Sequence, residues 1–303
     1  MSDQPSSEVA PIEEQREPCP TPLESQDIVR SFQEEMRQGP VAFEGGTITA
    51  TQFGSGPPLI FLPGTLGTPR LYALTAWLLR NDRQCWLLDH PNFDKNPPES
   101  KLVAKTAFAY ASVLTELFGG PVDIYASTFT VPICLRMMSS TPNVVKKAAL
   151  QSGWMEGTLT TAERLLLKIG KRLPVTMRRV PGWVSTQIQN HRPWFPPFDK
   201  TRFSFLLGET YQTNVSDASR RMLASTHTDL RDRVKEIPHE ILILRTEGDG
   251  QYITDQQEWL EKQLPNSQVS WMHTSGHYPY LTHPHRLVKS LREFFEIPKS
   301  ETV

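Results

Sequence analysis

Short apolar runs and longer amphipathic segments alternate along most of this chain. Six short runs are rich in apolar residues, and each is followed within a few residues by glycine, proline or polar residues. Runs of this kind are typical of strands that are covered on both faces of a sheet. The six predicted strands are Pro58–Leu62, Gln84–Asp89, Val122–Tyr125, Lys147–Ser152, Ile241–Arg245 and Val269–Met272.

The segments between these runs have apolar residues at helical spacing. Strands that alternate with helices predict a mostly parallel, doubly wound α/β sheet with helices on both faces. Ahead of this region, a short helix is predicted for Ile28–Gln38, and two hairpin strands for Val41–Phe43 and Thr47–Phe53. The helices predicted between and after the strands are Arg70–Leu79, Leu102–Phe118, Pro132–Met138 and Leu287–Phe295.

The interval from about residue 154 to residue 234 breaks this alternation. It contains helical segments such as Ala162–Ile169 but no persistent strand pattern. We expect a helical insertion that lies over the carboxyl ends of the strands as a lid. Its aromatic residues either line an apolar acyl pocket or form the lid's own core, and the sequence leaves both readings open. These residues are Trp183, Trp194, Phe195 and Phe198.

One segment of the expected lid, Leu165–Arg179, is both basic and amphipathic. A helix of this type can lie on an anionic membrane surface. The commoner arrangement is a solvated helix that packs its leucines inward, and this is the arrangement that we expect.

Composition excludes several classes of protein. The chain has 303 residues and a formal net charge of −1, which argues against a nucleic-acid-binding protein. Three cysteines without regular spacing favour neither a disulfide framework nor a zinc site. No signal-peptide pattern is present, and no apolar run approaches the roughly 18 residues of a transmembrane helix. We therefore expect a cytoplasmic protein, with residues 1–26, rich in Pro, Ser and Glu, as a disordered tail.

Polar residues suited to catalysis follow several of the predicted strands. Thr65 follows the first of them, and the stretch VDIYASTFTV (residues 122–131) runs from the third strand into adjacent hydroxyl residues. Asp249 and His277 follow the last two strands. The carboxyl ends of parallel strands meet at one edge of the sheet, where ligands bind. A hydroxyl nucleophile, a histidine base and a carboxylate that orients the histidine form a catalytic triad. By position, Thr65 N–H and Phe129 N–H are the candidate oxyanion donors.

Five stretches resemble the α/β-hydrolase superfamily: LIFLPGTLGT, CWLLDHPNF, VDIYAS, RVKEIPHEILILRTEGD and TSGHYPYLTHPHRL. More narrowly, Gly54–Phe295 resembles maspardin and its relatives. The resemblance implies an α/β-hydrolase domain over residues 27–303 with a helical lid over about 154–234. It also implies that Asp249 is the triad acid and His277 the triad base. The maspardin family keeps the hydrolase fold but lacks ordinary hydrolase activity and acts through protein partners.

The nucleophile motif of this superfamily, Gly-x-Ser-x-Gly, is altered in this chain. Aligned without a gap, it maps onto Ala126–Thr130 and puts Thr128 at the nucleophile position. The turn that holds the nucleophile has φ > 0, which is unfavourable for a β-branched residue. Thr130 adds a second branched side chain where the strand and the helix cross closely.

A shift of one residue would make Ser127 the nucleophile, and Ser127 is the second choice. This shift would put Tyr125 and Phe129, two large aromatic residues, at the positions where the motif has glycine. Pro132 supports the frame without a gap, because it then lies in the first helical turn, where its missing N–H costs little. We therefore favour Thr128 as the candidate nucleophile.

Two functions follow from these observations. The first, which we favour, is a maspardin-like pseudoenzyme, non-catalytic or weakly active, that binds a small apolar ligand or a protein partner. The second is an active hydrolase of a small ester or acyl substrate that uses Thr128, His277 and Asp249. No cofactor motif is present. Four clustered histidines could in principle bind a metal, but their loop spacing and the triad position of one of them favour no metal site. They are His273, His277, His283 and His285.

Overall fold

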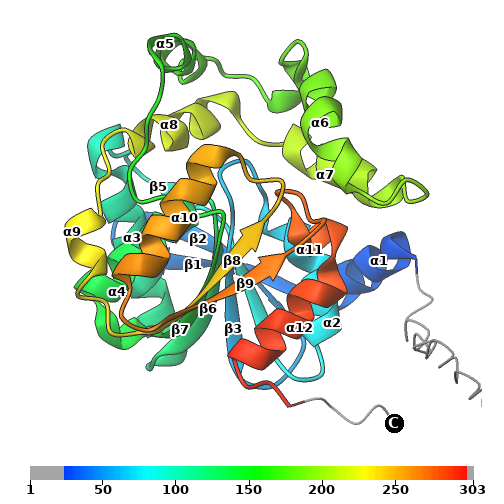
Figure 1. The fold of residues 1–303 in the computed structure, drawn as a ribbon, viewed down its shortest axis with the longest axis vertical. Helices are drawn as coiled ribbons and strands as arrows, with labels where there is room; N and C mark the ends of the chain where they lie inside the picture. Colours follow the sequence, from blue (N-terminus) through cyan, green and yellow to red (C-terminus); the bar gives the residue numbers. More distant parts are fainter. Residues whose placement is uncertain (1–23, 299–303) are drawn as a thin grey trace, which may run out of the picture.

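The computed structural model describes residues 24–298 (Figure 1). Most of the tail expected over residues 1–26 lies outside the described residues. Helix α1 (Ser25–Glu35) begins three residues before the predicted helix and buries Ile28 and Phe32. The predicted helix is wrong over its last three residues: Met36 is extended, and Arg37 and Gln38 belong to strand β1 and pair with β2.

Within residues 24–298, nine strands form one mixed sheet in the order β1-β2-β4-β3-β6-β7-β8-β9, with β5 paired to β2. Strands from β4 to β9 along this order pair in parallel, and the pairs that involve β2 are antiparallel. This arrangement confirms the predicted mostly parallel α/β sheet. The bounds are β1 Arg37–Phe43, β2 Gly46–Phe53, β3 Pro58–Leu62, β4 Gln84–Leu88, β5 Asn92–Phe93, β6 Val122–Ser127, β7 Val145–Gln151, β8 Glu240–Thr246 and β9 Ser267–Met272.

Side chains from the central strands alternate between two apolar cores, one on each face of the sheet. In β3, Ile60 and Leu62 enter the core beneath α3, α4 and α10, whereas Leu59 and Phe61 enter the core beneath α1, α2 and α12. Figure 1 shows these two helical layers on opposite sides of the sheet. Because both faces are covered, nearly every residue of β3 is apolar, which is why the sequence predicted this strand correctly.

The helices and short 3-10 turns outside the insertion frame this sheet. Their bounds are η1 Pro69–Tyr72, α2 Ala73–Leu79, α3 Glu99–Phe118, α4 Thr130–Ser140, η2 Pro142–Val144, α10 Gln251–Gln263, α11 Pro279–Thr282 and α12 Pro284–Phe294.

Between β7 and β8, the chain forms a helical insertion at the carboxyl ends of the strands (Figure 1). Two isolated β-bridges are its only strand-like pairings in the part of the chain that the structure describes. The insertion comprises α5 Thr161–Gly170, η3 Met177–Arg179, α6 Trp183–His191, η4 Arg192–Trp194, α7 Thr201–Tyr211, α8 Val215–Ser225 and α9 Arg231–Val234.

The insertion departs from expectation at helix α5. We expected its leucines to pack inward, and this expectation is wrong. Leu165, Leu166 and Ile169 are all exposed, and the only fully buried residue of α5 is Gly170. Gly170 lies against Ser219 of α8, where a methyl group would approach the hydroxyl to 2.4 Å. The helix therefore contacts α8 through a small residue and exposes Leu165, Leu166 and Ile169, whereas Leu167 is half-buried.

The four aromatic residues considered for an acyl pocket, Trp183, Trp194, Phe195 and Phe198, do not line the main cavity. Phe195 is buried against Phe203, and Trp183 packs in a small cluster with Met177. Trp194 packs on the Gly276 backbone, whereas Phe198 is exposed. Of the two alternatives left open above, a core of the insertion itself therefore applies to Trp183, whereas Phe195 belongs to the core beneath α1, α2 and α12.

Candidate active site

The sheet order reverses between β3 and β6, where β4 and β7 lie on opposite sides of this pair. The loops that leave β3 and β6 therefore diverge and open a crevice at their carboxyl ends, as in other doubly wound sheets. Thr65 lies in the first loop and Thr128 in the second. The topology thus brings together two residues that are separated by 63 positions in the sequence.

Thr128 has the backbone conformation of a nucleophile turn. Its φ is 48°, which is a genuine outlier for a β-branched residue. Its N–H donates to Gln151 O at 2.9 Å, and its C=O accepts from Val131 N at 3.1 Å. Helix α4 begins two residues later, with Pro132 in its first turn. The strained residue is thus Thr128, in agreement with the ungapped frame.

Ser127, the second-choice nucleophile, lies under this turn. It is fully buried, and its hydroxyl is 2.7 Å from the hydroxyl of Tyr72. The cavity at the site is lined by Thr128 and not by Ser127.

Thr130 is accommodated at the crossing of β6 and α4 by hydrogen bonding. Its hydroxyl accepts from Ser127 N–H at 3.2 Å and lies within hydrogen-bond distance of Leu62 O and Ser127 O. The branched side chain therefore links β3 to β6 at the point where the superfamily motif has glycine.

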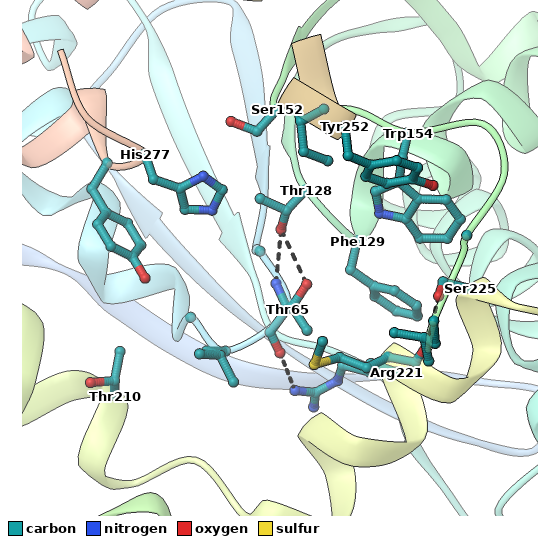
Figure 2. Close-up of a pocket in the computed structure, with 18 of the residues that line it drawn as sticks. Thr65, Thr128, Phe129, Ser152, Trp154, Thr210, Arg221, Ser225, Tyr252 and His277 are labelled. Carbon is teal, nitrogen blue, oxygen red and sulfur yellow. Dashed lines mark hydrogen bonds between the residues drawn. The ribbon is translucent and has the colours of Figure 1, made fainter. Parts of the chain in front are cut away.

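The hydroxyl of Thr128 points toward the loop after β3 (Figure 2). It accepts a hydrogen bond from Thr65 N–H at 2.9 Å and lies 3.4 Å from the Thr65 hydroxyl. No hydrogen bond joins Thr128 to His277 within residues 24–298. The backbone N–H that we assigned to an oxyanion thus holds the Thr128 hydroxyl instead.

Asp249 and His277 form the pair that the sequence predicts. Asp249 follows β8 and His277 follows β9, and His277 Nδ1 lies 2.7 Å from Asp249 Oδ1. Gly248 permits this approach, because a methyl group there would lie 2.5 Å from Gly276 Cα. An ionised carboxylate accepts from Nδ1–H, which leaves Nε2 as the free nitrogen of the imidazole. His277 lines the cavity, so this nitrogen is available to a bound molecule.

Ser152 is a site residue that the sequence did not reveal. It follows β7, is fully buried and has a φ of 53°. Its hydroxyl is 2.8 Å from both carboxylate oxygens of Asp249 and also accepts from Gln151 Nε2. Gln151 Nε2 lies 3.1 Å from His277 O as well. Asp249 is thus held between Ser152 and His277. The one available signal was the position of Ser152 at the carboxyl end of a predicted strand.

The cavity beside these residues has a volume of about 360 Å³. One wall holds Thr65, Thr128 and His277, and the rest is largely apolar and aromatic (Figure 2). Its apolar and aromatic residues include Leu66, Phe129, Trp154, Leu159, Ile253 and Tyr280. The volume fits a small molecule, and the walls favour an apolar one.

The helical insertion fixes the loop after β3. Arg221 of α8 donates to Thr65 O at 2.9 Å, and Glu209 of α7 accepts from the Thr68 hydroxyl at 2.8 Å. These contacts hold both ends of the segment that contains Thr65 N–H. The position of the candidate oxyanion donor therefore depends on the insertion as well as on the sheet.

A second histidine lies beside His277. The ring of His191, in α6, is 6.1 Å from the His277 ring and 4.8 Å from that of Tyr278. Burial, with a smaller contribution from the nearby His277, lowers the pKa of His191 to about 4. His191 is therefore neutral at pH 7 and adds no charge beside the Asp249–His277 pair.

The clustered histidines do not share a metal site in the described part of the chain, where no group of three or more His, Cys, Asp or Glu could hold a metal ion. His273 instead lies 3.2 Å from Glu247. Among the described helices, none is long and apolar enough to cross a membrane.

A hydroxyl on a strained strand-to-helix turn, followed in the chain by an Asp–His pair, defines the α/β-hydrolase class. A model of the alpha/beta hydrolase family matches residues 59–290, which is most of the chain. The chain therefore belongs to this family.

Several solved structures have the same fold at low sequence identity. A hydrolase from Pseudomonas aeruginosa PA01 is 12% identical, with a TM-score of 0.71 over 86% of this chain and 98% of the other. An esterase from Exiguobacterium antarcticum is 16% identical, with a TM-score of 0.71 over 84% and 97%. A bromoperoxidase from Bacillus anthracis is 14% identical, with a TM-score of 0.69 over 86% and 100%. No curated protein sequence matches the chain significantly. These matches support the superfamily but not the narrower resemblance to maspardin.

Proposed function

We propose that this protein is a slow hydrolase of small apolar esters, with Thr128 as nucleophile, His277 as base and Asp249 as the acid that orients His277. The observation that supports this proposal most is the Asp249–His277 hydrogen bond of 2.7 Å beside a hydroxyl whose backbone φ is 48°. Strained residues of this kind cluster at active sites, where the surrounding structure holds them in place.

The reaction requires the Thr128 hydroxyl to leave Thr65 N–H. Rotation about χ1 by one staggered step, roughly 120°, redirects Oγ1 and frees the Thr65 donor at the same time. The substrate carbonyl oxygen then accepts from Thr65 N–H and Phe129 N–H. The hydrogen bond from Thr65 N–H to Thr128 Oγ1, which this rotation breaks, contributes about 1 kcal/mol.

Proton transfer follows from this geometry. Thr128 Oγ1 gives its proton to His277 Nε2 as it attacks the carbonyl carbon, and Asp249 stabilises the imidazolium through Nδ1–H. The alcohol leaves with the proton from His277 Nε2, and an acyl group remains on Oγ1. Water then gives a proton to His277 Nε2 as it attacks the acyl carbon. His277 passes this proton to Thr128 Oγ1 as the bond from Oγ1 to the acyl carbon breaks, which releases the acid and restores the hydroxyl.

The substrate class follows from the cavity. A volume of about 360 Å³ with apolar and aromatic walls suits an ester with a short or medium acyl chain. The structurally similar protein from Exiguobacterium antarcticum is also an esterase.

A second candidate function is binding of an apolar ligand without turnover, which includes the maspardin-like reading. The hydrogen bond from Thr65 N–H to Thr128 Oγ1 favours it, because the nucleophile then occupies its own oxyanion site. This protein would use the same cavity as a receptor for a small apolar molecule or for the side chain of a protein partner.

The test compares hydrolysis of p-nitrophenyl esters of increasing acyl length. The variants are Thr128→Ala and His277→Ala, with His273→Ala as a matched control in the same loop. A slow hydrolase loses activity in the first two and keeps it in the third. Equal rates for all proteins would refute catalysis, and saturable quenching of tryptophan fluorescence by a fatty acid without turnover would then support the binding function.

A direct check on the nucleophile uses a fluorophosphonate probe and mass spectrometry of the labelled peptide. A phosphonyl group on Thr128 that is lost in Thr128→Ala would support the assignment. Thr128→Ser should raise the hydrolysis rate about tenfold, because a serine has no methyl group to move during the χ1 rotation. A Thr128→Ser rate equal to that of wild type would show that the rotation does not limit the reaction.

A further inference from the structure

Helix α5 lies at the outer end of the insertion (Figure 1). Large apolar side chains of this helix are exposed to solvent. The exposed fractions are 59% for Leu165, 68% for Leu166 and 50% for Ile169, and Leu173 in the following turn is 41% exposed. Helical spacing places Leu165, Leu166 and Ile169 on one side of the helix, and Leu173 follows three residues after its end. Single exposed leucines are common on proteins, but a contiguous group of four is typical of an interaction surface.

Cationic side chains lie along one edge of this face. Residues 160–180 contain six cationic residues and one acidic residue, although the whole chain has a net charge of −1. At 100° per residue, Arg164 and Lys168 fall together beside the leucines, and Arg172 lies in the turn that follows the helix. Within residues 24–298, none of these three forms a salt bridge. The acidic residue, Glu163, is held in the helix capping box with Thr160.

Two contacts that hold α5 in place do not involve this face. The capping box begins α5, and the contact of Gly170 with Ser219 attaches it to α8. Leu165, Leu166 and Ile169 therefore remain exposed and open to contact with a binding partner.

We infer that the outer face of α5 docks on an anionic lipid surface. An apolar stripe that is flanked by lysine and arginine matches a bilayer, because the leucines enter the acyl boundary while the cations contact anionic headgroups. A second copy of this chain is a poorer occupant, because it would bring the same cations against these cations. The inference does not depend on the catalytic role of Thr128.

Docking by α5 would bring the cavity close to the lipid. Gly157, Thr158 and Leu159 line the cavity, and Thr160 then caps α5. The wall of the cavity and the proposed docking face are therefore consecutive in the chain.

The test is flotation of the full-length protein with vesicles of phosphatidylcholine alone and of an equimolar mixture with phosphatidylglycerol. We expect binding to the mixed vesicles only, and weaker binding at high salt. Leu165→Ser with Leu166→Ser, and separately Lys168→Glu with Arg172→Glu, should each reduce the bound fraction about tenfold or more.

Matched controls lie on α3. Phe108 is exposed there, so Phe108→Ser removes an apolar side chain from another helix, and Lys101→Glu with Lys105→Glu makes the same change of charge. These controls should bind like wild type. Equal binding of wild type and the α5 variants would overturn the inference, as would a dimer, measured by light scattering, that only the leucine variant dissociates. Because all of these substitutions are at exposed positions, they should leave the melting temperature unchanged. The melting temperature of each variant is measured as a control.

Discussion

Ser152→Ala tests whether the Ser152 hydroxyl positions Asp249, the candidate acid of the triad. The change removes one oxygen and leaves the backbone and the cavity shape almost intact. In the structure this hydroxyl lies 2.8 Å from both Asp249 oxygens and is fully buried. A hydrogen bond to a charged group contributes about 1.5–3 kcal/mol. We therefore expect the free energy of unfolding to fall by about 2 kcal/mol.

Activity should fall with stability in this variant. Asp249 keeps its contact with His277 but loses the hydroxyl that fixes the carboxylate plane, so the imidazole is oriented less well. We expect a lower kcat for ester hydrolysis and a nearly unchanged KM, because the effect acts on the base and not on binding. The assays are urea unfolding monitored by fluorescence and steady-state kinetics with the best ester of the panel.

Ser152→Gly is the matched control for backbone strain. Glycine also lacks the hydroxyl, but it adopts φ > 0 more easily than alanine, by about 1 kcal/mol. The glycine variant should thus be more stable than the alanine variant, with an equally low kcat. Unchanged stability and kcat in Ser152→Ala would refute the idea that this hydroxyl positions Asp249.

Three further predictions concern other parts of the structure. Gly64→Ala should abolish hydrolysis without unfolding the protein, because a methyl group there would lie 2.8 Å from Thr128 Oγ1; a full rate in the ester assay would contradict this. The lowered pKa of His191, about 4, means that the folded state binds fewer protons than the unfolded state below pH 6.5, so stability falls as pH drops from about 6.5 to 4. Between neutral pH and pH 4, the free energy of unfolding should fall by about 2 kcal/mol less in His191→Asn than in wild type, as measured by urea unfolding. Parallel pH profiles of the two proteins would refute this. Arg83→Met leaves Asp123, 2.9 Å away and buried, without its partner, which should cost about 3–5 kcal/mol. Adding Asp123→Leu should recover much of this loss, and no recovery would argue against an unpaired buried charge.

The sheet could be predicted from the sequence because its central strands are covered on both faces. β3 spans Pro58–Leu62 in both the prediction and the structure, since a buried parallel strand has no polar positions to obscure it. The edge of the sheet gave weaker signals. β5 has two residues and no periodicity, and the first residues of β1 are polar and exposed, so they read as the end of a helix.

The candidate site could be predicted only in part. Asp249 and His277 were found because each follows a strand and because their chain order is that of a triad. Ser152 could not be assigned, because the sequence does not show which strand end faces Asp249. The sequence also could not show that the apolar face of α5 is exposed. An amphipathic pattern identifies an apolar face but does not show whether the rest of the protein covers it.

The altered nucleophile motif illustrates the same limit at one turn. From the sequence alone, we expected Thr130 to crowd the crossing of strand β6 and helix α4 with a branched side chain. In the structure its hydroxyl contacts backbone groups of Leu62 and Ser127 and joins β3 to β6. This link, together with the hydrogen bond from Thr128 N–H to Gln151 O, holds the turn in a conformation that costs about 1–3 kcal/mol. Thr130 therefore supports the turn. At the candidate nucleophile position, the chemical difference from a serine is the methyl group of Thr128.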